Sequence, residues 1–138
     1  MSIAQTQTTS FKAEIYQAVH NLLTDTLKIA LYNGNADLNA ATTVYSTANE
    51  VVAAGYTAGG NTLTGVTLNV SDSTVYVNFA NTSWTAALTA RCALIYNVTQ
   101  GNKSIAVIDF GADKTSVTTF LITMPANTAT AALIRSSN

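Results

Sequence analysis

The chain has 138 residues, of which 48% are hydrophobic and only 9% charged, and its formal net charge is -1. This length fits one domain with one hydrophobic core, and the apolar content is too high for a disordered chain. The weak charge excludes the usual nucleic-acid-binding protein, because such proteins hold phosphates with clustered lysine and arginine.

The N-terminal segment Met1–Thr9 is polar and rich in threonine and glutamine, which predicts a flexible arm (residues 1–9) before a single domain over residues 10–138. It has neither the basic region nor the apolar run of a signal peptide. The sequence contains no run of about 18 apolar residues, so no membrane-spanning helix is expected. After the arm, Ser10 suits a helix N-cap, and apolar residues recur at helical spacing from Phe11. The pattern predicts one helix over about Phe11–Leu23.

Most of the remaining chain alternates apolar and polar residues, as half-buried β-strands do. The alternation predicts strands over Leu27–Tyr32, Leu63–Val70, Val75–Phe79, Thr118–Met124 and Ala129–Arg135. Within the third of these, Val75, Val77 and Phe79 are expected to point inward. Tyr76 and Asn78 are expected to point outward.

Two further strands, Arg91–Asn97 and Ser104–Phe110, are apolar on both faces and are joined by the loop Val98–Lys103. A strand of this kind lies in the middle of a sheet or at a subunit contact, and we expect this pair at the centre of the sheet core. One helix followed by many short strands predicts a mainly β fold. We expect an antiparallel β-sandwich, jelly-roll-like, with one N-terminal α-helix.

The sequence offers no catalytic, cofactor-binding or metal-binding constellation. His20 is the only histidine and Cys92 the only cysteine, and nothing in the sequence ties them together. We expect His20 to pack on or beside the helix and Cys92 to behave as a small buried hydrophobe. Asp109 and Asp113 could share a cation, but the ligand spacing of a calcium loop does not occur, so the sequence gives a calcium site little support.

The run Gly55–Thr62 has the outline of a phosphate-binding loop, but Asn61 stands where such a loop needs its lysine. A glycine loop that uses positive φ angles is therefore expected in place of a nucleotide site.

A surface with few charges gives little repulsion between copies, so we expect self-association. Aromatic and arginine side chains are enriched at protein contacts. Trp84 suits a core anchor and an interface anchor equally well. The candidate interface residues are Trp84, Tyr56, Tyr76, Arg91 and Tyr96.

Several short segments follow one another in a characteristic order after the arm. They are FKAEIYQAVHNL (Phe11–Leu22), DTLKIALY (Asp25–Tyr32), TTVYSTANEV (Thr42–Val51), GYTAGG with LTGV (Gly55–Val66), TSWT (Thr82–Thr85), LTARCALIYN (Leu88–Asn97) and AVIDFG (Ala106–Gly111). In this order the chain resembles a family of small virion structural proteins of tailed bacteriophages. The family often has glycine after the arginine, where this chain has Cys92.

The resemblance implies a structural protein of a phage virion, with no enzymatic activity, cofactor or metal. Such proteins are described as capsid decoration (cement) proteins or as tail or fibre components. We expect a decoration protein, a homotrimer that binds the major capsid protein, made in the host bacterial cytoplasm and located in the virion. A tail or tail-fibre structural component is the alternative. A small hydrolase is disfavoured, since it would need His20 or a carboxylate pair in a pocket, and replacing His20 and Glu50 would have to abolish its activity.

Overall fold

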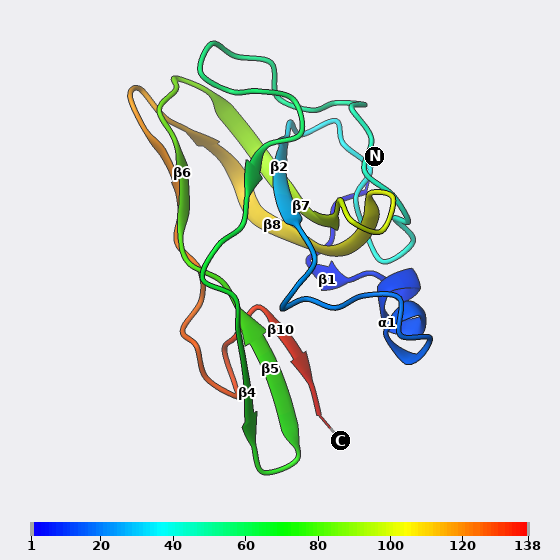
Figure 1. Cartoon of the computed structure of the whole chain (residues 1–138). Coiled ribbons are helices and arrows are strands. Elements are labelled where there is room, and N and C mark those ends of the chain that lie inside the picture. Colours follow the sequence, from blue (N-terminus) through cyan, green and yellow to red (C-terminus); the bar gives the residue numbers. More distant parts are fainter. Residues whose placement is uncertain (1, 138) are drawn as a thin grey trace.

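The structure, a computed structural model, describes residues 2–137 and is mainly β, with 40% strand and 6% helix. Its sheets are antiparallel and form a β-sandwich-like fold with a single short helix near the N-terminus, which confirms the predicted fold class (Figure 1). No helix within residues 2–137 has the length and apolar character needed to cross a membrane.

One layer is a five-stranded antiparallel sheet. Its strands, in spatial order, are β1 (Thr6–Gln7), β8 (Lys103–Thr115), β7 (Thr89–Asn97), β2 (Leu27–Tyr32) and β3 (Asn61–Thr62). The two strands predicted to be apolar on both faces correspond to β7 and β8, which are neighbours in this sheet. β7 lies in the middle, and seven of its nine residues are buried. Both faces of the sheet must therefore be covered by other parts of the chain.

The second layer consists of two smaller sheets (Figure 1). A three-stranded sheet holds β10 (Ile134–Ser136), β5 (Thr74–Asn78) and β4 (Thr67–Ser71) in that order, and β6 (Thr82–Trp84) pairs with β9 (Phe120–Ile122). The main hydrophobic core lies between the layers, where Ile29 and Ile95 of the five-stranded sheet join the same cluster as Trp84 and Phe120.

The other face of the five-stranded sheet is covered by the long connection between β2 and β3. Ala30 and Leu94 point to this side and form a second cluster with Leu38 and Tyr45 of the connection. Because successive residues of a strand point to opposite faces, β2 and β7 supply both clusters at once. This double covering explains why these strands are apolar throughout.

The helix is shorter than predicted. α1 spans Thr9–Tyr16, and Thr8 is its N-cap, with a hydroxyl that accepts a hydrogen bond from the Phe11 N–H. The predicted extension to Leu23 is wrong because Ala18 has a φ of 59°, which a right-handed helix cannot accommodate. Leu22 is still buried, but from the loop that follows α1.

The predicted N-terminal arm is part of the fold over its described length. β1 pairs with β8, and Ser2 and Ala4 exchange backbone hydrogen bonds with Leu38. The polar composition that suggested a free arm instead reflects an edge strand, which keeps one side open to water.

The hairpin formed by β4 and β5 departs from the predicted burial. Val75 and Val77 share a face, as expected, but Val75 is 39% exposed because the hairpin extends beyond the rest of the molecule (Figure 1). Asn78, expected outside, is buried and donates to the backbone oxygen of Pro125 at 2.7 Å. The last predicted strand is shifted, since β10 begins only at Ile134.

Candidate functional site

His20 is buried in a polar network that joins the loop after α1 to β7. Its Nε2 atom lies 2.9 Å from a carboxylate oxygen of Glu14, and its Nδ1 atom lies 3.0 Å from the amide nitrogen of Asn97. Because the Asn97 amide donates, Nδ1 accepts and Nε2–H donates to Glu14. Both ring nitrogens thus have structural partners, which is the packing role that we predicted.

The same Asn97 amide also donates to Asp25, at 2.8 Å. Burial of Asp25 opposes ionisation, but hydrogen bonds from the Asn21 backbone and the Asn97 side chain hold the pKa of this carboxyl below its usual value. The network therefore fixes the connection between α1 and β2 at the end of the central strand.

The glycine run is organised around a carboxylate of the chain itself. Glu50 is 6% exposed, and its two oxygens accept hydrogen bonds from the hydroxyls of Tyr45 and Tyr56, both at 2.6 Å, and from the Gly59 N–H at 2.7 Å. Backbone N–H groups of glycine loops bind anions, and here the anion is internal. The loop that resembles a phosphate-binding motif already has its negative charge.

The glycines of this loop also allow it to lie against β2. Gly60 has a φ of 78°, and a Cβ atom at this position would lie 1.8 Å from the backbone oxygen of Ile29. Only glycine permits both the angle and the approach, so the glycine run serves packing.

Tyrosines attach this loop to the sheet. The Tyr96 hydroxyl donates to the Gly59 carbonyl at 2.6 Å, and its ring stacks on that of Tyr45 with centroids 4.5 Å apart. The Tyr56 hydroxyl accepts from the Leu31 N–H at 2.9 Å. Burial, helped by the nearby Glu50, raises the pKa of Tyr96 to about 12.

Three of the five predicted interface residues are therefore interior residues. Tyr56 and Tyr96 are buried and form the hydrogen bonds that attach the glycine run to the sheet. Trp84 is 4% exposed and lies between the rings of Tyr56 and Phe120. Their assignment to a protein interface is wrong in this subunit, because the second sandwich layer and the long connection already cover them. Trp84 is a core anchor, although its Nε1–H has no hydrogen-bond partner within residues 2–137.

The other two predicted interface residues are partly exposed. Arg91 forms an ion pair with Asp109 on the neighbouring strand β8, so its charge is already matched. The Gly111 N–H and Arg91 hold the pKa of Asp109 below its usual value. Tyr76 is half-buried at the centre of the three-stranded sheet. No group of three or more His, Cys, Asp or Glu side chains that could hold a metal ion occurs in residues 2–137.

Large apolar side chains are exposed at several places on the surface. They are Ile15, Tyr16, Leu23, Val44, Val52, Leu68, Val70, Val75, Val98, Val117 and Leu121. Sequence reasoning did not predict that they are exposed. An alternating pattern shows which residues share a strand face, but it does not show whether anything lies opposite that face.

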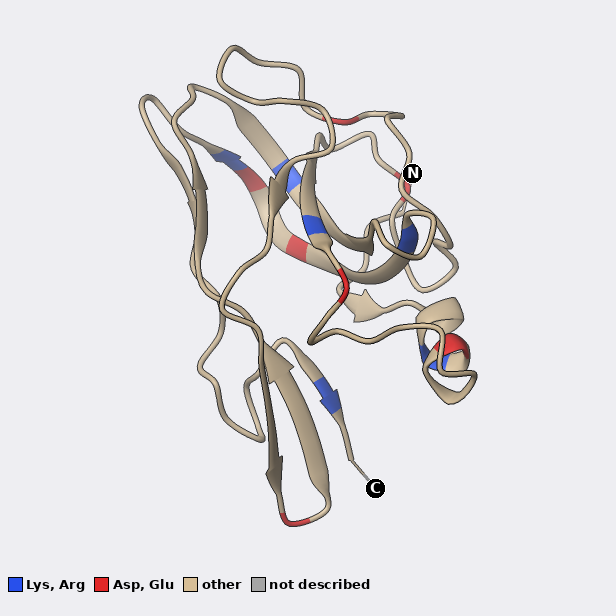
Figure 2. Ribbon diagram, in the orientation of Figure 1, with Lys and Arg blue, Asp and Glu red and all other residues tan. Residues whose placement is uncertain are grey.

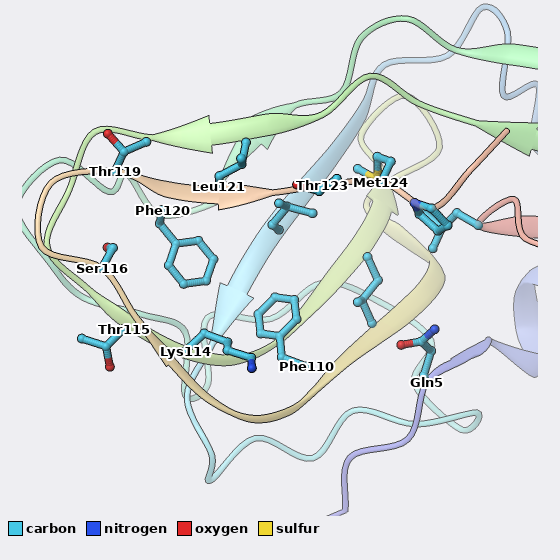
Figure 3. Close-up of a pocket in the computed structure, with 14 residues that line it drawn as sticks. Gln5, Phe110, Lys114, Thr115, Ser116, Thr119, Phe120, Leu121, Thr123 and Met124 are labelled. Carbon is cyan, nitrogen blue, oxygen red and sulfur yellow. The ribbon is translucent and has the colours of Figure 1, made fainter.

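One apolar cleft lies at the open side of the sandwich, between β8 and β9 (Figure 3). Its volume is about 580 Å³, and the rings of Phe110 and Phe120 lie in it with centroids 6.0 Å apart. Lys114 is its only charged lining residue, and no histidine, cysteine or carboxylate lines it. The cleft can take up apolar groups, and its amine and hydroxyl groups, such as those of Lys114 and Ser116, have no histidine, cysteine or carboxylate beside them in the lining.

A second, larger apolar groove lies between α1 and the β4–β5 hairpin, with a volume of about 810 Å³. Ile15 and Tyr16 line it on one side, and Leu68 and Val75 on the other. Both concave surfaces are thus suited to binding apolar side chains.

Comparisons of this chain with protein-family models, with curated proteins and with solved structures found no match.

Proposed function

We propose that this chain is a structural protein of a tailed-bacteriophage virion, a capsid decoration (cement) protein that binds the major capsid protein and stabilises the shell. The observation that carries the proposal is that exposed apolar side chains and an apolar cleft lie on a β framework that has few charges. Val52 is 97% exposed and Val117 84%, and most residues that line the cleft between β8 and β9 are apolar. Apolar residues gathered at a concave surface are typical of sites that bind other molecules.

The energetics of such a surface suit a shell. Burial of apolar area contributes roughly 25 cal/mol per Å², and few charges must be stripped of water when this surface meets a neighbour. Each contact can be modest, because a decoration protein acts through many copies on one particle. Lysine, arginine, aspartate and glutamate are sparse along the whole ribbon (Figure 2).

The proposal includes no catalytic step. His20 and Glu50, the residues that a hydrolase would need, both have all their polar side-chain atoms engaged by partners within the chain. This supports a structural role over a hydrolytic one.

The experiment that tests the proposal combines binding and localisation. Purified protein is added to empty procapsids, and the shells are then separated from free protein and heated. Decoration predicts binding over the whole head and a higher melting temperature of the shell. Antibody labelling confined to the tail would instead support the tail or tail-fibre alternative. Absence of the protein from purified particles would refute both virion roles.

A further inference from the structure

The groove between α1 and the three-stranded sheet has two apolar walls. Figure 1 shows the elements that carry them, with α1 on one side and β10 and β5 on the other. Phe11, Ile15 and Leu22 line the wall on the helix side. Leu68, Val75 and Ile134, each from a different strand, line the opposite wall.

The sheet wall continues outward along the hairpin. The strand register pairs Leu68 with Val77 and Val70 with Val75, so one face of the hairpin carries only apolar side chains. On each strand the exposed fraction rises toward the hairpin tip, from 5% for Val77 to 39% for Val75 on β5 and from 47% for Leu68 to 66% for Val70 on β4. The apolar face is thus longer than the part of the molecule that covers it.

The charges around the groove and on the hairpin are complementary. Lys12 and Arg135 line the groove, and neither has a carboxylate within ion-pair distance in residues 2–137. Asp72, in the turn at the hairpin tip, is the only charged residue of the hairpin (Figure 2). Within the described chain it also has no ion-pair partner.

The hairpin lacks the usual protection of an exposed edge. β4 is the edge strand of its sheet, and its sequence TLNVS contains neither a charged residue nor proline. Soluble proteins protect such edges with lysine, proline or a covering segment. An apolar, unprotected hairpin next to an apolar groove indicates that a polypeptide covers both.

We propose that the occupant is the β4–β5 hairpin of a second copy of this chain. The apolar faces of the two hairpins pack against each other as two sheets do, with opposite directions, so that each tip lies at the partner's groove. Asp72 of one copy then faces Lys12 and Arg135 of the other. The inference concerns self-association and does not require the virion role.

This arrangement has a consequence for subunit number. The residues that the hairpin offers, such as Leu68 and Val75, also line the groove that receives the other hairpin. The contact is therefore the same for both copies, which is the property of a twofold dimer. A dimer, rather than the trimer expected from the sequence, follows. The capsid contact would then use other exposed residues, such as Val52 and Val117.

The first test measures mass in solution by analytical ultracentrifugation of the full chain and of the Val70→Thr variant. Threonine keeps the strand propensity and Val70 is exposed in the single subunit, so the fold should remain intact. Because each dimer buries two copies of this residue, we expect the dissociation constant to rise at least about tenfold. Val52→Thr, a change at a residue that is 97% exposed and lies outside both the hairpin and the groove lining, is the matched control and should leave the dimer unchanged.

The second test fixes the orientation by cross-linking. Ser73→Cys places a thiol at the hairpin tip and Lys12→Cys places one at the groove, while the native Cys92 is buried and does not interfere. Under mild oxidation a mixture of the two variants should form a disulfide-linked pair. Ser73→Cys alone should not, because the tips lie at opposite ends of the dimer.

A wild-type chain that is monomeric at its highest soluble concentration, or trimeric, would overturn the inference. So would efficient cross-linking of Ser73→Cys to itself. Procapsid binding is measured separately on the Val70→Thr variant. If this variant still decorates shells at a concentration where it is monomeric, the virion role holds without dimerisation. If a confirmed wild-type dimer fails to bind shells, the virion role fails alone.

Discussion

Replacing Glu50 with glutamine tests whether the buried carboxylate holds the long connection on the sheet. Glu50→Gln preserves the shape of the side chain but removes its charge and supplies an NH₂ group where an oxygen now accepts. Three donors, the Tyr45 and Tyr56 hydroxyls and the Gly59 N–H, converge on the two carboxylate oxygens. At least one tyrosine hydroxyl must reorient in the variant.

The expected loss follows from the strength of these bonds. A hydrogen bond to a charged group contributes about 1.5–3 kcal/mol, whereas one between neutral groups contributes about 1 kcal/mol. Weakening of the bonds that remain and loss of at least one of the three together cost about 3 kcal/mol, and relief of the cost of burying the charge returns part of this. We expect the free energy of unfolding to fall by about 2 kcal/mol.

Urea unfolding followed by the fluorescence of Trp84 measures this loss, because the indole is 4% exposed and adjoins the ring of Tyr56. With a typical dependence of unfolding free energy on urea, the midpoint should fall by about 1 M or slightly more. Asp113→Asn is the control, since it changes the net charge equally at an exposed position. Equal midpoints for the two variants would refute the role given to Glu50.

Three further outcomes are expected. Gly60→Ala should lower the free energy of unfolding by more than about 3 kcal/mol. Gly101→Ala should lower it by only about 1 kcal/mol, because Gly101 has a similar φ of 71° but no atom within 4 Å of the added Cβ. Similar urea midpoints for the two variants would contradict the steric argument. Cys92 should react with iodoacetamide at pH 8 only after unfolding, because burial raises the pKa of its thiol to about 11 and leaves it 0% exposed; rapid labelling of the native chain would show that β7 is not interior. Burial also raises the pKa of Tyr96 from 10.0 to about 12, so the unfolded state releases this proton at a lower pH than the folded state does. The contribution of Tyr96 to stability should therefore be complete below about pH 10 and be lost between about pH 10 and 12. A smaller loss in Tyr96→Phe over that range is the check, and an identical loss would exclude Tyr96 as a source.

Sequence reasoning predicted neither the groove nor the Glu50 network, and each omission has a physical reason. The two segments that now form the groove, α1 and the β4–β5 hairpin, are separated by about fifty residues. The Glu50 network was also missed, although an isolated glutamate ahead of a glycine run was a usable signal. Glycine N–H groups without a lysine suggest that a carboxylate of the chain itself supplies the anion.

The sequence by itself determined the mainly β class, the central position of β7 and the alternation within Thr118–Met124 that forms β9, where Phe120 and Ile122 share a buried face. These properties follow from the twofold periodicity of a strand, which is local and can be read residue by residue. Only the tertiary structure decided that the N-terminal segment is an edge strand, that Trp84 lies in the core and that Val70 is left uncovered. A side chain is buried or exposed according to what packs opposite it, and that partner comes from a distant part of the chain.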